Sequence, residues 1–170
     1  DPAKAYYTSG ALLGAARLLG DARCDAIVWN GSAGGLAGFA HDRKLAADIT
    51  AATGAGATTS SLAILEMFAR LGVRRFAMAT LNPPQANRVI AGHFGAEGYE
   101  CVADASREGI VDNFAMAAVP PADIAERLTE LAAHRPDALL VYGTNTRGAP
   151  AALEVERATG IPVIDSVLAG

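Results

Sequence analysis

Asp25-Ala26-Ile27-Val28-Trp29-Asn30-Gly31-Ser32 and Asp137-Ala138-Leu139-Leu140-Val141-Tyr142-Gly143-Thr144-Asn145 follow the same pattern, 112 residues apart. Each stretch has an acidic start, a short apolar run, one aromatic residue and then a group of small polar residues. Apolar runs bounded in this way are typical of parallel strands that are buried on both faces of a sheet. The small polar residues then lie at the carboxyl ends of two strands, where open α/β sheets bind their ligands. We therefore expect a single site built from two similar halves.

Helical and strand signals alternate along the rest of the chain. Apolar residues at helical spacing and short apolar runs between turn residues predict the two kinds of element. The predicted helices cover 9–19, 42–53, 62–71 (with Ser60 or Ser61 as its cap), 83–95, 121–134 and 151–158, and the predicted strands cover 26–29, 57–59, 75–80, 99–103, 139–142 and 162–164. The stretch 104–113 is the most loop-like. This order predicts the α/β class with a mostly parallel, doubly wound sheet.

Length, charge and cysteine content narrow the classes of function. The 170 residues suit one domain or two small lobes that share a cleft. A net charge of −4 gives no basic face, so we expect no nucleic-acid partner. No apolar run approaches the roughly 18 residues that span a bilayer, so we expect no membrane segment. The two cysteines and three histidines have no metal-site spacing, which predicts no metal and favours a cytoplasmic location.

Three segments in order carry a resemblance to a known family. They are Leu71-Gly72-Val73-Arg74-Arg75-Phe76-Ala77, Thr80-Leu81-Asn82 followed by Asn87, and Gly160-Ile161-Pro162-Val163-Ile164-Asp165-Ser166. From about Ser9 to Ser166 the chain resembles the Asp/Glu racemase superfamily, in its arylmalonate decarboxylase and maleate cis-trans isomerase branch. The resemblance implies two facing lobes, small carboxylic acids as ligands, and chemistry that uses no cofactor.

The resemblance also implies how the chain is divided. The whole of 1–170 is one Asp/Glu racemase-like unit, with a first lobe of 1–72 plus 161–170 and a second lobe of 73–160. Family members carry a further strand and helix before the matched region. We therefore expect either that the chain is a piece of a longer protein, or that a partner subunit in a homo-oligomer covers the exposed sheet edge.

The chain departs from the family at the positions with the most direct chemical roles. Asn30 and Gly143 stand where family members can place cysteines, and Asn82 stands where they have a tyrosine. Cys24 precedes Asn30 by a whole strand, which separates it from the cleft by about 20 Å at about 3.3 Å per residue. Cys101 falls inside another strand. We expect both cysteines to be buried and structural, so thiol chemistry of the family type is not expected.

Groups that bind carboxylates remain in the cleft. Asparagine amides, hydroxyls and backbone N–H groups beside glycines can hold carboxylate oxygens. We expect the substrate-binding residues to be Asn30, Gly31, Ser32, Thr58, Asn82, Gly143, Thr144 and Asn145. Arg147 is either a clamp for the ligand or a solvated surface arginine.

Few residues can carry a proton. Asp165 ends the last strand and is a weak candidate for the catalytic acid, since burial would raise its pKa. The alternative is a carboxylate that accepts hydrogen bonds from the following loop. His41 is expected to be exposed, and Tyr142 to pack in the core.

Three functions compete on this evidence. The first is a cofactor-independent lyase or isomerase that acts on a small carboxylate or dicarboxylate through an altered, thiol-free site. The second is a non-catalytic carboxylate-binding or regulatory protein that kept the cleft and lost the chemistry. The third is a scaffold with a vestigial cleft. The resemblance favours the enzyme, while the loss of both cysteines favours the binding protein.

Overall fold

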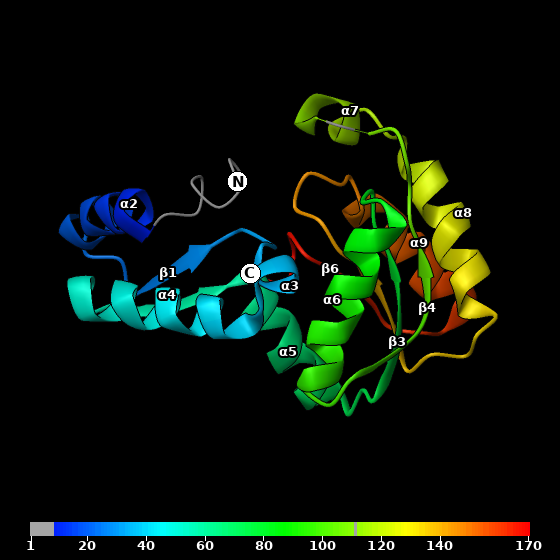
Figure 1. Cartoon of the computed structure of the whole chain (residues 1–170), viewed down its shortest axis with the longest axis horizontal. Helices are drawn as coiled ribbons and strands as arrows, with labels where there is room; N and C mark the ends of the chain where they lie inside the picture. Colours follow the sequence, from blue (N-terminus) through cyan, green and yellow to red (C-terminus); the bar gives the residue numbers. More distant parts are fainter. Residues whose placement is uncertain (1–8, 111) are drawn as a thin grey trace.

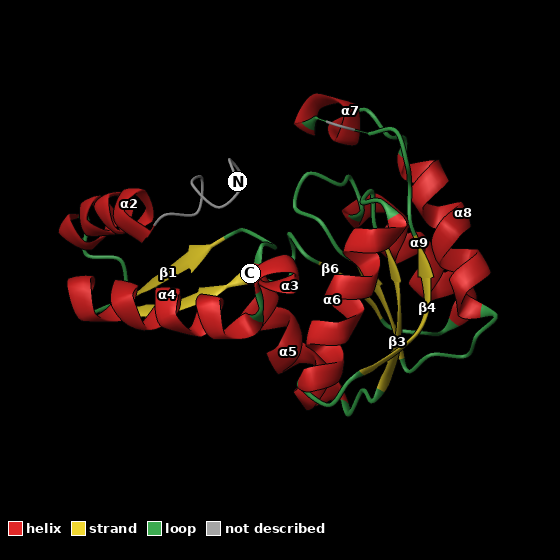
Figure 2. Ribbon diagram, in the orientation of Figure 1, coloured by secondary structure: helices red, strands yellow, loops and turns green. Residues whose placement is uncertain are grey.

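The structure is a computed structural model that describes residues 9–110 and 112–170. Helices and strands alternate along the chain (Figures 1 and 2). The helices are α2 (Ser9–Asp21), α3 (Gly34–Ala37), α4 (Phe39–Thr53), α5 (Ser60–Leu71), α6 (Pro84–Ala96), α7 (Asn113–Ala117), α8 (Pro121–Ala132) and α9 (Ala149–Thr159). The strands are β1 (Ala26–Trp29), β2 (Gly56–Thr59), β3 (Arg75–Ala79), β4 (Glu100–Ala105), β5 (Ala138–Val141) and β6 (Val163–Asp165).

The strands form two separate parallel sheets, which define two lobes. In the first lobe β1 pairs with β2, and α2 and α4 lie beside this pair (Figure 2). In the second lobe the strand order is β4-β3-β5-β6. All its pairings are parallel, so each strand is reached by a crossover connection. The predicted α/β class with parallel sheets is confirmed.

The four-stranded sheet is buried on both faces because its central strands alternate between two cores. Phe76, Met78 and Leu140 pack in one cluster with residues of α5 and α6. Their neighbours Ala77 and Leu139 pack in a second cluster with residues of α8 and α9. The side-chain period of two in a strand produces this division.

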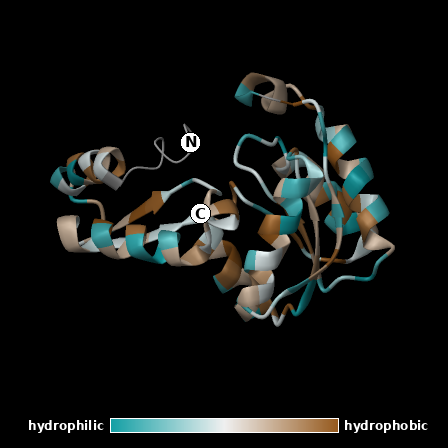
Figure 3. Ribbon diagram, viewed as in Figure 1, coloured by the Kyte–Doolittle hydropathy of each residue, from teal (hydrophilic) through white to brown (hydrophobic). Residues whose placement is uncertain are grey.

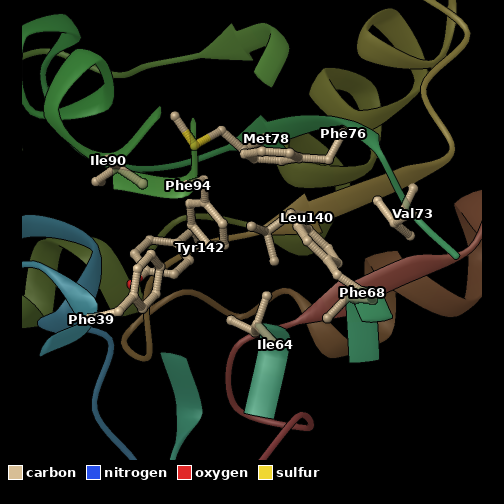
Figure 4. Packing of buried hydrophobic residues seen from close by; sticks show 12 residues of the cluster. Phe39, Ile64, Phe68, Val73, Phe76, Met78, Ile90, Phe94, Leu140 and Tyr142 are labelled. Atoms are coloured by element: carbon tan, nitrogen blue, oxygen red, sulfur yellow. The ribbon is translucent and has the colours of Figure 1, made fainter. Parts of the chain in front are cut away.

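One hydrophobic cluster joins the two lobes. Phe39 of α4 meets Phe94 of α6 at 4.9 Å between ring centroids, and Phe68 of α5 meets Phe76 of β3 at 5.2 Å. In Figure 4, Phe39 and Phe94 lie beside Tyr142, the residue that follows β5, and Phe68 and Phe76 lie farther along the same cluster. Edge-on and tilted ring pairs of this kind stabilise a packed interior. The two lobes therefore share a core beneath the loops that follow β1 and β5.

The first-lobe strand β1 is less buried than the sequence pattern predicts. Ile27 is 5% exposed and packs against Leu45 and Ile49 of α4, but Val28 is 40% exposed. Figure 3 shows the apolar colour of β1 beside the helices of this lobe. Only the Ile27 face of β1 is fully covered, so burial on both faces is a wrong prediction for this strand.

Several helix ends differ from the predicted ones. The side chain of Thr59 accepts a hydrogen bond from Leu62 N–H at 3.1 Å and caps α5, so the predicted caps Ser60 and Ser61 are wrong. α4 begins at Phe39 rather than Asp42, directly after Gly38 with its φ of 93°. α5 ends as predicted at Leu71, and Gly72, with a φ of 69°, is its C-cap.

The end of the chain belongs partly to the second sheet. β6 pairs with β5, with Leu140 opposite Ile164, so the assignment of 161–170 to the first lobe is wrong for this strand. The physical reason is the crossover through α9, which returns the chain to the sheet that it left. Gly170 then lies near Val28 and Ser60 of the first lobe. The remaining lobe boundaries stay a prediction.

Two further features concern segments outside the sheets. In the predicted loop 104–113, residues 104 and 105 belong to β4 and residue 113 begins α7. Residues 1–8 of the predicted first lobe lie outside the described residues. No helix in the described ranges has the length and apolar character to cross a membrane.

Candidate functional site

The loops after β1 and β5 enclose a cavity of about 380 Å³. Its polar wall comes from Asn30, Gly31, Ser32, Asn82, Asn113, Gly143, Thr144 and Asn145. Its apolar and aromatic wall comes from Leu12, Trp29, Ala33, Leu36, Ile90, Met116 and Tyr142. Seven of the eight residues that the sequence places in the site therefore surround one space.

Thr58 is the predicted site residue that the cavity does not include. It lies within β2, opposite Val28, and its hydroxyl contacts the Thr59 carbonyl at 3.5 Å. The next residue, Thr59, is fully buried and donates its hydroxyl to Asp42 at 2.9 Å. Thr58 lies one residue before the end of β2 and does not reach the cavity.

In the first loop Asn30 and Gly31 take defined positions. Asn30 Oδ1 accepts a hydrogen bond from the Ser60 hydroxyl at 2.7 Å, which leaves the NH₂ group of the amide as a donor for a ligand. A Cβ atom at Gly31 would overlap the indole of Trp29. Only glycine lets the Trp29 ring lie against the backbone here, so this residue shapes the cavity wall.

In the second loop the Gly143 N–H is already used by the protein. Gly143 has a φ of 143°, and its N–H donates to Ser166 Oγ at 3.0 Å. The Ser166 hydroxyl in turn donates to the Val141 carbonyl at 2.7 Å. The sequence predicts that the Gly143 N–H faces an anion, but this N–H is bonded within the protein, so Gly143 shapes the loop instead.

Asn145 connects the second loop to α7. Its side-chain amide donates to Asn113 Oδ1 at 2.7 Å, and both residues line the cavity. Phe114 of α7 is 89% exposed, while Met116 is partly buried and reaches the cavity. Figure 1 shows that α7 stands away from both sheets.

Asn82 is held by a buried network after β3. Its N–H donates to Thr80 Oγ1 at 3.1 Å, and the Thr80 hydroxyl donates to Asn87 Oδ1 at 2.6 Å. The Asn87 side chain donates to Asp104 at 2.6 Å. Thr80 and Asn87 are buried, so the network fixes the turn that presents Asn82 to the cavity.

Asp165 lies outside the cavity wall. It is 3% exposed, and its Oδ1 accepts hydrogen bonds from Val167 N–H at 2.9 Å and Leu168 N–H at 3.3 Å. Burial raises the pKa of Asp165, and the two backbone hydrogen bonds offset part of that rise. Its Oδ2 has no hydrogen-bond partner among the described residues. This geometry is that of a carboxylate that accepts hydrogen bonds from the following loop, and not of an acid that donates a proton to a ligand.

The other chemical candidates also lie away from the cavity. Arg147 is exposed and His41 half-buried, and neither lines the space. Cys24 is exposed, which makes its predicted burial wrong, because it lies in the turn before β1 and not inside the strand. Cys101 is partly buried, and burial raises its pKa to about 11, with a smaller effect from Asp104.

Tyr142 is the one ionisable side chain among the described residues that line the cavity. It is 2% exposed, and burial raises its pKa. Its ring packs in the core, as the sequence predicts, but its hydroxyl reaches the first loop. Nearby Asp42 is fully buried, which raises its pKa, and the Thr59 hydroxyl offsets part of the rise. No group of three or more His, Cys, Asp or Glu side chains in the described ranges could hold a metal ion.

Sequence reasoning missed the part of the cavity that comes from helices. Asn113 and Met116 belong to α7, whose start was visible as a capping pattern: the Asp112 side chain accepts from Ala115 N–H at 2.8 Å. Leu12 and Ile90 read as ordinary core positions of two helices. Nothing in the sequence distinguishes them from residues that face the interior.

Comparisons with known proteins agree with this architecture. The family model described as arylmalonate decarboxylase matches residues 10–170. The structure of unliganded arylmalonate decarboxylase is 28% identical, with a TM-score of 0.83, over 95% of this chain and 71% of that one. No curated protein matches the sequence.

Two maleate isomerases share the fold at lower identity. The maleate isomerase from Pseudomonas putida S16, with maleate, is 24% identical over 91% of this chain and 64% of its own, with a TM-score of 0.83. The maleate cis-trans isomerase from Nocardia farcinica, with a covalently bound succinylcysteine intermediate, is 20% identical over 93% of this chain and 67% of its own, with a TM-score of 0.85.

Proposed function

Since the chain belongs to the arylmalonate decarboxylase family, we propose that its cavity binds a small carboxylate or dicarboxylate that carries an apolar group, and that it decarboxylates or isomerises this ligand without a thiol. The observation that carries the proposal is the division of the cavity wall. Amides and hydroxyls of Asn30, Ser32 and Thr144 suit carboxylate oxygens, and Trp29 and Met116 suit an apolar substituent.

The chemistry of the wall determines what a decarboxylation would look like here. Loss of CO₂ from a malonate leaves the electron pair delocalised into the remaining carboxylate. Hydrogen-bond donors that face those oxygens stabilise the developing charge. The proton that replaces CO₂ would come from water, because neither a thiol nor a carboxyl group lines the space among the described residues.

A stereochemical consequence follows from this proton source. With 2-methyl-2-phenylmalonate as substrate, we expect 2-phenylpropionate with little enantiomeric excess, because water can approach the planar intermediate from either face. Chiral chromatography of the product measures this. A product of high enantiomeric purity would show that a positioned acid exists and would contradict the water route.

The absence of cysteine at positions 30 and 143 favours a second candidate. In that function the protein binds a carboxylate and does not transform it, as a regulatory or carrier protein does. Phenylmalonate, maleate, aspartate, glutamate and hydantoins, incubated with the protein in D₂O and followed by NMR, separate the two. Turnover or C–H exchange supports the enzyme. Saturable binding without either supports the binding protein, and no binding at all rejects both.

A matched pair of variants ties the result to this cavity. Thr144→Ala removes a hydroxyl from the wall, whereas Thr129→Ala removes one from α8, where it donates to the Ala125 carbonyl. We expect Thr144→Ala to weaken ligand binding about three- to tenfold, the loss typical of one hydrogen bond, and Thr129→Ala to leave binding unchanged. Equal effects of the two variants would place the ligand elsewhere.

A further inference from the structure

Tyr142 reaches from the second lobe into the first. Its ring packs edge-on against Phe94 at 5.8 Å between centroids, and the hydroxyl points away from β5 (Figure 4). The hydroxyl donates to the Ser32 carbonyl at 2.8 Å, accepts from Gly35 N–H at 2.8 Å, and meets Ser61 Oγ at 2.9 Å. A phenol has one proton and two lone pairs, so the Ser61 hydroxyl is the donor in the third contact and the Tyr142 hydroxyl is fully used.

Gly35 is held from two sides by the second lobe. A Cβ atom on Gly35 would overlap the Tyr142 hydroxyl, so this close approach requires glycine. The Gly35 carbonyl meets His93 Nδ1 of α6 at 2.8 Å. The N–H and the carbonyl of Gly35 thus both contact side chains of the second lobe. These contacts hold α3 in place, because a helix this short has little stability of its own.

Residues of the first lobe also pack against this loop. Asp42 is fully buried, and a Cβ atom on Gly34 would overlap its carboxylate. Its Oδ2 accepts from the Thr59 hydroxyl, and its Oδ1 has no hydrogen-bond partner among the described residues. Gly34 therefore packs directly on the buried Asp42 carboxylate, and the neighbouring Gly35 N–H donates to the Tyr142 hydroxyl.

We propose that Tyr142 is a positioning residue of the cavity: its hydroxyl latches the loop 31–37 across the lobes, and ligand affinity depends on that latch. Ser32, Ala33 and Leu36 of this loop all line the cavity. Binding groups work only when other contacts hold them in place. The latch is independent of the reaction, and the part that concerns affinity rests on the proposed carboxylate ligand.

The test compares two tyrosines that each lose one hydroxyl. Tyr142→Phe removes the latch and keeps the ring. Tyr99→Phe is the matched control, because Tyr99 also packs against Phe68 and bonds one backbone carbonyl, that of Leu65 at 3.4 Å, away from the cavity. The amide hydrogen exchange rates of the loop 31–37 show whether the latch holds the loop, and they need no ligand. We expect exchange at Gly35 to rise at least tenfold in Tyr142→Phe and to stay within twofold of wild type in Tyr99→Phe.

Unchanged exchange at Gly35 in Tyr142→Phe would overturn the proposal. Should that variant fail to fold, Ser61→Ala takes its place, since it removes one bond of the latch and keeps the tyrosine, and the expected rise is about threefold. Phenylmalonate then tests the functional part: Tyr142→Phe should raise its Kd or KM about tenfold with a smaller change in kcat. If the wild type binds none of the carboxylates tested above, the proposed function is rejected, and the exchange result alone decides the latch.

Discussion

The segments 25–32 and 137–144 share a sequence pattern, yet their strands have different surroundings. All four residues of β5 are buried, between two strands and two layers of helices. In β1 only Ile27 is buried, and Val28 is 40% exposed. An apolar run shows what a strand can bury, whereas the neighbouring strands and helices decide what it does bury. The loops that follow the two strands also differ, because each is fixed by a different set of buried polar groups.

The largest expected effect is a loss of stability when an apolar side chain of β5 is truncated, compared with one of β1. Leu140→Ala opens a cavity in a fully buried position and should lower the free energy of unfolding by about 2–5 kcal/mol. Val28→Ala in β1 should cost less than about 1 kcal/mol, because its side chain is already half in water. Urea denaturation of both variants measures the pair. Equal losses would mean that β1 is buried by a surface that the described residues do not include.

The next effect concerns the two positions without cysteine. Gly143→Cys places a Cβ atom on a residue with φ of 143°, and it should cost about 1–3 kcal/mol of stability. Asn30→Cys removes the acceptor of the buried Ser60 hydroxyl and should cost about 0.5–1.5 kcal/mol. Gly143→Ala separates the backbone strain from the thiol. A Gly143→Cys protein as stable as the wild type would show that the loop relaxes freely, which its bond to Ser166 argues against.

Much of this architecture was predictable because local pattern and global fold agree. Turn residues bound each apolar run, and the parallel strands β3 and β5 bring Asn82 and Gly143 to one edge of their sheet. Asn30 follows β1 in the other sheet and reaches the same cavity from the first lobe. The burial of β1 could not be predicted, since it depends on which helices pack on its two faces. The role of the Tyr142 hydroxyl was hidden as well, because its partners are backbone groups of Ser32 and Gly35, more than a hundred residues away.

The two loops also share a feature that the sequence repeat does not show. Each lies against a buried aspartate: the Asp42 carboxylate packs on Gly34 in the first lobe, and Asp165 packs on Gly148 in the second. Each carboxylate keeps one oxygen without a partner among the described residues. Their hydrogen bonds differ, since Asp42 accepts from a side-chain hydroxyl and Asp165 from two backbone N–H groups.

The smallest predicted effect is a pH dependence that both aspartates should produce. Burial raises the folded-state pKa of each above its ordinary value of 3.8. The folded protein therefore holds these protons more tightly than the unfolded chain, and the stability they contribute is complete below pH 3.8 and is lost as the pH rises through the folded pKa values. Asp42→Asn and Asp165→Asn remove this loss. Relative to wild type, each variant should gain stability as the pH rises from about 4, and the double variant should show the sum, because the two sites share no partner. Urea denaturation across that range measures the difference, and an offset that stays constant with pH would mean that both carboxylates ionise freely in the folded protein.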